Sequence, residues 1–362
     1  MAKTDRTAKL KCLLLWGLAA LVVSAQAGET WYRGNTHTHT FWSDGNDFPE
    51  MAAHWYKQHG YQFVVLTDHN IMPDRTGWKD VSHMHVEKPA EKLAAAFGED
   101  AVVTRENAGG RTEHRLLSYA QVSERLDEPG VFVVVPGEEL TNQVHPNPVH
   151  MNAVNTTRTL GAQKHPTVRE MAIREAARAR RLEAEQKRPV FIQLNHPNWR
   201  WDMPAEVLAE ALEADGFELV NPSCHNLGND TFPGSERMWD IASTLRLNKY
   251  GAEPIWAVAA DDTHNYHDFA SHPQKANPGR AFVMARAATL SGDALAQALK
   301  DGDFYASTGV LLETVTYEPE TRRLTVTVDP KDPGSAYRIQ VVGTPRAVSL
   351  DSRPGPEVLY EV

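Results

Sequence analysis

The chain has 362 residues, 41% of them hydrophobic, and a formal net charge of −10. This length suits one large domain, or one domain with a small appendage. The negative charge argues against non-specific binding to nucleic acid, which needs an excess of Lys and Arg. Beyond the N-terminus, no segment is apolar for long enough to span a bilayer.

Residues 1–27 predict a secretory signal peptide. A basic start is followed by an apolar segment, 12–23, and by the small-x-small cleavage signal Ala25-Gln26-Ala27. The alternative is a membrane anchor, for which the apolar segment is short. We therefore predict cleavage after Ala27, export to the periplasm or the extracellular space, and no stable membrane anchor afterwards. Cys224 is then the single cysteine, which excludes a disulfide within one chain.

From Trp31 onwards, short β-rich segments alternate with longer helical patterns. Several segments, such as Phe63-Val64-Val65-Leu66, are continuously apolar, which is typical of strands buried on both faces of a parallel sheet. Strands that alternate with helices indicate βα units, and seven of them favour a barrel over an open sheet. The predicted strands are 31–38, 61–67, 131–138, 149–155, 189–195, 217–221 and 255–260.

Helical patterns cover 48–59, 167–186, 204–214 and 235–247. Residues from about 72 to 130 do not fit a single βα unit and are read as an insertion with helical pieces at 90–97 and 118–126. The insertion is either a lid or substrate wall, or an outer decoration of the barrel. The main domain thus spans 28–309, and 310–362 is a small β-rich module with predicted strands 312–317, 324–328 and 337–342.

The histidines are the compositional anomaly, because all 16 lie between His37 and His272 and several share short segments with Asp or Glu. This distribution indicates a metal site. Thr36-His37-Thr38-His39 places two imidazoles on the same side of a strand, unless they are solvent-facing residues of an edge strand. Asp44 follows in the loop after this strand, where it either returns to the same site or belongs to the turn before the next helix.

Later strands carry similar residues near their ends, where α/β barrels place their active sites. Glu138 and Glu139 are costly at a buried strand end without a cation, and periodicity does not say which of them bridges metals. Each motif alone has a structural alternative, such as a cap or a hydrogen-bonded histidine, but their position on successive strands favours metal binding. The other candidates are Asp68, His69, His150, His196, Asp262 and His264.

The order of these motifs resembles the PHP (polymerase and histidinol phosphatase) superfamily of metallohydrolases. The resemblance covers about residues 32–307, and segments 32–34 and 302–309 are most similar to its exported carbaryl-hydrolase-type branch. It implies an α/β fold, a distorted seven-stranded (β/α)7 barrel, with two or three divalent ions (Mn, Zn or Fe).

The resemblance also implies three sets of ligands: His37, His39 and Asp262; His150 and His196; and Asp44, His69 and His264. The Gly-x-Glu pattern of the family selects Glu139 as the carboxylate that the first two ions share. Glu138 would then support the site without binding a metal itself. Many members carry His where this chain has Asp44, so the third site is where the chain departs from the family.

We expect an exported metal-dependent hydrolase that acts on a small-molecule ester, and a phosphoesterase is the first hypothesis. A carbamate or carboxylic ester hydrolase is the alternative, and an inactive metal- or ligand-binding envelope protein is the third. A metal-activated water would be the nucleophile. Asp68 and His225 are candidate leaving-group acids, although His225 fits a simple loop residue equally well. Arg280 is a candidate anion clamp.

Overall fold

The computed structural model describes residues 29–84, 86, 88–144, 147–224, 228–269, 276–330, 336–343 and 357–361. The predicted signal peptide and His225 lie outside these residues, so both stay predictions. Within the described ranges, no helix combines the length and the apolar character that a membrane crossing needs.

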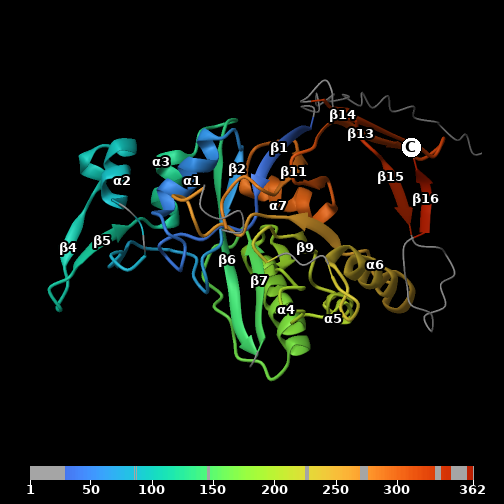
Figure 1. Cartoon of the computed structure of the whole chain (residues 1–362), viewed down its shortest axis with the longest axis horizontal. Helices are drawn as coiled ribbons and strands as arrows, with labels where there is room; N and C mark the ends of the chain where they lie inside the picture. Colours follow the sequence, from blue (N-terminus) through green and yellow to red (C-terminus); the bar gives the residue numbers. More distant parts are fainter. Residues whose placement is uncertain are drawn as a thin grey trace, which may run out of the picture.

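One nine-stranded sheet forms the centre of the molecule (Figure 1). Its order is β10-β9-β8-β7-β6-β2-β1-β11-β12, and the edge strands β10 and β12 lie next to each other, so the sheet is a nearly closed barrel. The strands are β1 (Thr30–Asn35), β2 (Phe63–Leu66), β6 (Val133–Val144), β7 (Asn147–Val154), β8 (Phe191–Leu194), β9 (Gly216–Val220), β10 (Trp256–Ala259), β11 (Phe282–Ala287) and β12 (Phe304–Ser307). The predicted α/β class and barrel-like sheet are confirmed, but the count of seven strands is not, because β11 and β12 join the same sheet.

The sheet is mixed rather than parallel. β1, β2 and β6 pair in parallel, as do β8, β9 and β10, but β7 is antiparallel to both of its neighbours. β6 ends at Val144 and β7 begins at Asn147, a connection too short for the helix of a parallel crossover. β7 therefore starts at the end of the barrel where β6 stops, and His150 pairs with Thr141, close to Glu139.

β6 is longer than the predicted strand 131–138, and both adjacent glutamates lie within it. Neighbouring residues of a strand face opposite sides, so Glu138 and Glu139 point away from each other. The Glu138 carboxylate accepts the backbone N–H groups of Leu160 and Gly161, each at 2.6 Å. Glu139 is left to face the histidines.

Helices cover the outside of the barrel at the positions that the sequence predicts: α1 (Pro49–Gln58), α4 (Val168–Gln186), α5 (Ala205–Glu210) and α6 (Ser235–Leu245). The alternation along β2 shows how the layers form, because Val64 packs outward with α1 while Val65 belongs to the barrel interior. An additional helix, α7 (Gly292–Asp301), packs Leu295 and Leu299 against that interior cluster. Continuous apolar strands are thus buried on both faces.

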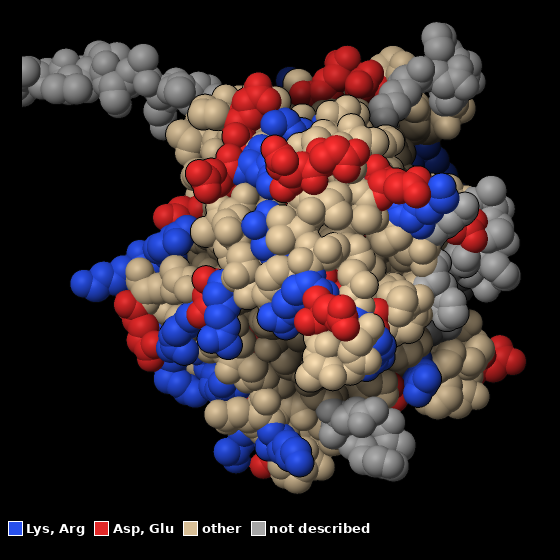
Figure 2. Space-filling model, turned by 90° about the vertical axis from the view of Figure 1, so that its left-hand side faces the viewer, with Lys and Arg blue, Asp and Glu red and all other residues tan. Residues whose placement is uncertain are grey.

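The insertion contains β3 (Gly77–Lys79), α2 (Pro89–Phe97), β4 (Thr104–Glu106), β5 (Thr112–Leu116) and α3 (Tyr119–Leu126). Its strands form a separate sheet, β3-β5-β4, and α2, β4 and β5 project to one side of the barrel (Figure 1). Figure 2 views the molecule from the side to which the insertion projects. On this side, Asp and Glu side chains gather towards the top of the view, and Lys and Arg side chains towards the lower left.

Part of the insertion contacts the loop that carries Asp44. The Trp42 indole N–H donates to the Leu117 carbonyl at 2.8 Å, and the Lys79 ammonium donates to the Ser43 carbonyl. Phe41 and Phe48, at the two ends of this loop, share a core cluster with side chains of the insertion. Residues of the insertion therefore pack against the loop at 41–48, and its role as a lid or substrate wall stays a prediction.

The chain after residue 310 forms two strand pairs, β13 (Leu311–Glu318) with β14 (Arg323–Asp329), and β15 (Gln340–Gly343) with β16 (Glu357–Glu361). The first pair matches two of the predicted strands, and β15 is shorter than the predicted strand 337–342. The division into domains stays a prediction.

The burial of Glu50, in the first turn of α1, predicts that the stability of the fold depends on pH. Its side chain is buried, and its Oε1 lies 3.4 Å from Arg125 Nη1. Burial raises the pKa of Glu50 to about 7. A carboxyl whose pKa is raised on folding binds its proton more tightly in the folded state, so the protein is most stable below the unfolded pKa of about 4.3 and loses stability as the pH rises to about 7.

Glu50→Gln removes this ionisation. We expect the substitution to raise the free energy of unfolding at pH 8 by on the order of 3 kcal/mol and to change it much less at pH 5. Urea unfolding at the two pH values measures the difference. Glu124→Gln, on an exposed position of α3, is the control and should show no such pH dependence. An equal effect of Glu50→Gln at both pH values would contradict the assignment.

Candidate metal centre

Nine predicted ligands lie together at one end of the barrel. His37 and His39 follow β1, His69 follows β2, and His196 follows β8. The bridges Thr38 to Thr263 and His69 to Glu139 join the segments just beyond the strands. Among the described residues, three groups bring their ligand atoms within 4.8 Å of one another: His37, His39 and Asp262; His69, Glu139 and His150; and His39, Asp44, His69 and His264.

The first group is fully buried and matches the first predicted set. His37 Nε2 and His39 Nε2 lie 3.0 Å apart, and Asp262 Oδ1 lies 3.2 Å from each of them. Burial would lower the pKa of His37, but Asp262 and Glu218 raise it well above its usual value. Two ring nitrogens that face each other beside a carboxylate oxygen form a typical cation site.

Glu139 lies between the groups. Its Oε1 is 3.1 Å from both His37 Nε2 and His150 Nδ1, and its Oε2 is 2.6 Å from His69 Nδ1. Burial alone would raise the pKa of Glu139, but His150 and His37 hold it well below the usual range. Despite the close imidazole, Glu139 Oε2 is a buried oxygen without a well-formed hydrogen bond in the described chain, which is the state of an oxygen that a cation would satisfy.

The second group differs from the predicted set of His150 and His196. His69 takes the place beside Glu139 and His150, whereas His196 Nε2 is 3.7 Å from Glu139 Oε1. The His196 ring centroid lies 4.9 Å from that of His150, so it borders the same space. His69 thus belongs to two groups, through Nδ1 to Glu139 and through Nε2 to Asp44.

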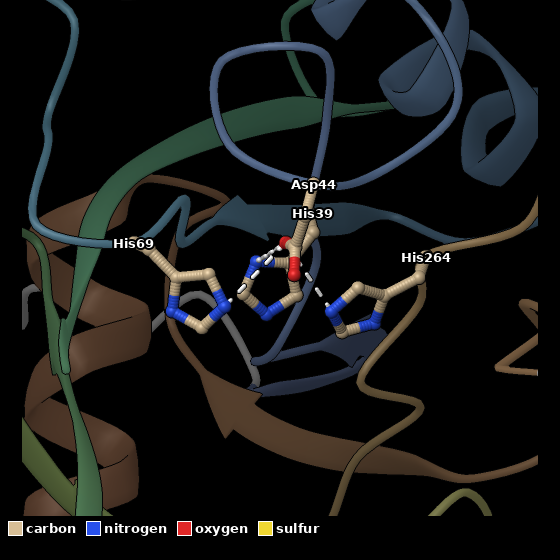
Figure 3. A group of neighbouring side chains, drawn as sticks. All are labelled: His39, Asp44, His69 and His264. Carbon is tan, nitrogen blue, oxygen red and sulfur yellow. Dashed lines mark ion pairs between the residues drawn. The ribbon is translucent and has the colours of Figure 1, made fainter. Parts of the chain in front are cut away.

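The third group surrounds Asp44, with His69 and His264 on opposite sides of it and His39 between them (Figure 3). Asp44 Oδ1 is 3.4 Å from His69 Nε2, 3.4 Å from His264 Nε2 and 3.6 Å from His39 Nδ1. Burial would lower the pKa of His69 and His264, but Asp44 helps to raise them to about 10 and about 9. Asp44 therefore brings a carboxylate oxygen to the position between these imidazoles.

Glu218 is the functional residue that sequence reasoning missed. This buried side chain of β9 places Oε1 2.6 Å from His37 Nδ1, and its Oε2 accepts the backbone N–H of His196 at 2.8 Å. A carboxylate behind a ligand histidine fixes the ring orientation and its tautomer, which leaves His37 Nε2 for a metal. The sequence feature that could have identified Glu218 is its position as a lone carboxylate among the apolar residues of β9.

Asp68 lies beneath the loop that carries Asp44. Its carboxylate accepts the backbone N–H and the hydroxyl of both Thr40 and Ser43, at 2.6–3.0 Å. Asp68 is 1% exposed, and burial raises its pKa. These contacts are those of a residue that positions the loop, and within the described chain none of its hydrogen bonds reaches a histidine. Its role as a leaving-group acid stays a prediction.

Arg280 forms hydrogen bonds that connect two loops. Its guanidinium donates to the Pro222 carbonyl at 3.3 Å, and its backbone N–H donates to Asp261 at 2.7 Å. Asp261 also accepts the Tyr56 hydroxyl at 2.9 Å and the Gly279 N–H at 2.8 Å. The anion-clamp role of Arg280 therefore stays a prediction, beside an observed role in joining two loops.

The exposed side of the centre is given by its ligands. His37, His39 and Glu139 are at most 1% exposed, whereas the Asp44 side chain is 57% and that of His264 is 30% exposed. The centre is therefore open to solvent on the side of Asp44 and His264.

The loop after β8 lies beside two of the site histidines. The Trp199 ring lies 5.3 Å from that of His196 and 6.2 Å from that of His150. The Arg200 guanidinium lies 4.8 Å over the Trp199 ring. Arg200 has a φ of 61° and His196 a φ of 27°, a left-handed backbone that costs non-glycine residues energy and is concentrated at functional sites.

The fold and the clustered side chains together define a candidate centre for divalent ions at one end of a barrel-like α/β fold. No protein-family model and no curated protein matches the chain. It is similar, at 18% identity and a TM-score of 0.45 over 80% of this chain and 74% of the other, to a two-domain protein containing predicted PHP-like metal-dependent phosphoesterase from Bacteroides vulgatus ATCC 8482. It is also similar to PsfC from Pseudomonas syringae PB-5123, at 14% identity and a TM-score of 0.39 over 77% of this chain and 92% of the other. A likeness at these scores says nothing of activity, which has to be inferred from the side chains of this chain.

Proposed function

We propose that the chain is an exported, metal-dependent hydrolase of the PHP superfamily, and that it is a phosphoesterase with a small-molecule substrate. The observation that carries the proposal is the position of Glu139. Oε1 faces His37 and His150, while Oε2 faces His69 at 2.6 Å and His39 at 3.4 Å. Both oxygens of this buried carboxylate face ring nitrogens, so Glu139 would be a shared anionic ligand for bound divalent cations.

The residues fit divalent cations. Imidazole and carboxylate donors together suit Zn, Mn or Fe, and the buried Glu139 Oε2 has no well-formed hydrogen bond in the described chain, so a cation would satisfy it. Bound ions would activate a water for attack on the ester and neutralise the charge that develops on the substrate oxygens. The protein holds the geometry for this step, because Glu218 fixes His37 and Asp68 fixes the loop of Asp44.

Metal removal tests the proposal. We expect chelator-stripped protein to be inactive, and reloading with Mn²⁺ or Zn²⁺ to restore hydrolysis of a nitrophenyl phosphomonoester or phosphodiester. An acetate ester and an N-methylcarbamate are assayed beside them. Restored activity confined to these two neutral substrates would replace the phosphoesterase by the alternative hydrolase. Bound metal without turnover of any of the four would favour the binding-protein hypothesis.

Arg200 supports a phosphate substrate over a neutral one. It is exposed at the rim, stacks on Trp199, and its guanidinium makes no hydrogen bond or ion pair within the described part of the chain. A stacked guanidinium keeps its edge donors available for the oxygens of a phosphate. By contrast Arg33, from a segment that suggested the carbaryl-hydrolase-type branch, packs between Tyr61 and Phe282 as a structural residue.

We expect Arg200→Ala to lower kcat/KM for a phosphate ester by about 10- to 100-fold, the effect of losing a hydrogen-bonded charge, and to leave turnover of a neutral ester nearly unchanged. Steady-state kinetics on both substrate types measures the split. Arg158→Ala, at an exposed position after β7, controls for loss of one positive charge. Equal losses on charged and neutral substrates would make Arg200 a structural residue.

A further inference from the structure

We propose a second binding site, for a di- or triphosphate group, in a cavity between the 160–166 loop and helix α4. The cavity has a volume of about 520 Å³. Lys164 and His165 line it from the loop, and Arg174, Arg178 and Arg181 line it from the helix. The site uses no residue of the metal centre, so it goes beyond the proposed hydrolase activity.

The cavity is rich in positively charged side chains, although the chain as a whole has a negative net charge. The lining contains four Lys and Arg side chains and one carboxylate, Glu170, in a chain whose net charge is −10. Arg174, Arg178 and Arg181 follow at intervals of four and three residues, which places them on one face of α4. Like charges at this spacing destabilise a helix, and a bound anion relieves that repulsion.

Three of these cations have unused donors. Arg174 reaches Glu170 only at 3.4 Å, and Lys164 and Arg181 make no hydrogen bond or ion pair with the described part of the chain. Arg178, in contrast, is fixed by the buried Glu175. Guanidinium groups bind phosphate oxygens through paired N–H donors, so several of them around one cavity suit an anion of more than one phosphate.

Arg178 also connects the cavity to the barrel. It donates to the carbonyls of Leu160 and Gly161, each at 3.0 Å. The N–H groups of these same two residues donate to Glu138, the neighbour of Glu139. Arg178 therefore links the cavity to residues 160–161, which are bonded from both sides, and anion binding in the cavity should slow the opening of this segment.

The test is calorimetric titration of the full chain with pyrophosphate after removal of metals with a chelator, which takes the metal centre out of the measurement. We expect binding that weakens with added salt. Arg174→Ala/Arg181→Ala should weaken it by about tenfold or more, since two charge-assisted contacts are lost. Arg158→Ala/Arg169→Ala removes the same charge from exposed positions outside the cavity and should bind as the unchanged protein does.

Hydrogen exchange gives a second readout. Pyrophosphate should slow exchange of the Leu160 and Gly161 amides in the unchanged protein and not in Arg174→Ala/Arg181→Ala. Thermal unfolding is used to check that both double variants are folded. The proposal is overturned if the metal-free chain binds no pyrophosphate at millimolar concentration, or if the two double variants bind it equally well. Neither outcome bears on the hydrolase activity, which the metal-loaded assays decide.

Discussion

Glu139→Gln is expected to lower kcat/KM on a phosphate ester by on the order of 10³-fold and to reduce the bound metal. The amide has no charge and a single acceptor oxygen, so it cannot face His37 and His69 as a shared anionic ligand. The buried imidazoles are then left without their counter-charge, which also weakens the remaining cation sites. Elemental analysis of the purified variant measures the metal, and kinetics with saturating metal measure the activity.

Glu138→Gln is the matched control, because the chain offers a second glutamate one residue away on the opposite face of β6. It touches the Leu160 and Gly161 amides instead of the histidines. We expect full metal content and activity near that of the unchanged protein, with about 1–2 kcal/mol of stability lost because the amide nitrogen cannot accept one of the two backbone N–H groups. Metal loss in Glu138→Gln, with Glu139→Gln unaffected, would show that the two glutamates have been assigned the wrong way round.

Much of the fold was predictable because local patterns and burial agree. The apolar segment 63–66 is a strand buried on both faces, and the helical pattern 167–186 is helix α4 with Thr167 as its N-cap. The site could be anticipated for a related reason. Strand ends of a barrel meet at one rim, so His37, His69 and His196 come together although they lie far apart in the chain.

Other features depend on contacts that a sequence does not contain. The antiparallel direction of β7 follows from the short connection after Val144, whose length shows only when both strand ends are known. The choice of Glu139 over Glu138 follows from which face of β6 meets the barrel interior. Asp68, at a strand end next to His69, has the position of a site residue, yet its four hydrogen bonds go to the loop at 40–43.

Glu218 is the clearest case of a residue that acts through another, and Glu218→Gln tests that role. The substitution removes the negative charge 2.6 Å from His37 Nδ1 and, if the amide turns, sets a donor against a donor. We expect metal affinity, and with it activity at limiting metal, to fall about 10- to 100-fold while saturating metal restores part of the activity. Metal titration followed by kinetics gives both values.

The comparison that decides the role of Glu218 uses Asp215→Asn. Asp215 is a carboxylate just before β9 that accepts from Arg180 at 2.7 Å and from the Ile192 N–H at 2.8 Å. It shares the strand neighbourhood of Glu218 but not the histidines, so its loss should change stability and leave metal affinity as it was. If Glu218→Gln behaves in the same way, Glu218 holds the barrel together rather than orienting His37. A fall in metal affinity confined to Glu218→Gln makes the carboxylate behind His37 part of the metal centre, because packing alone gives no reason for the two variants to differ in that measurement.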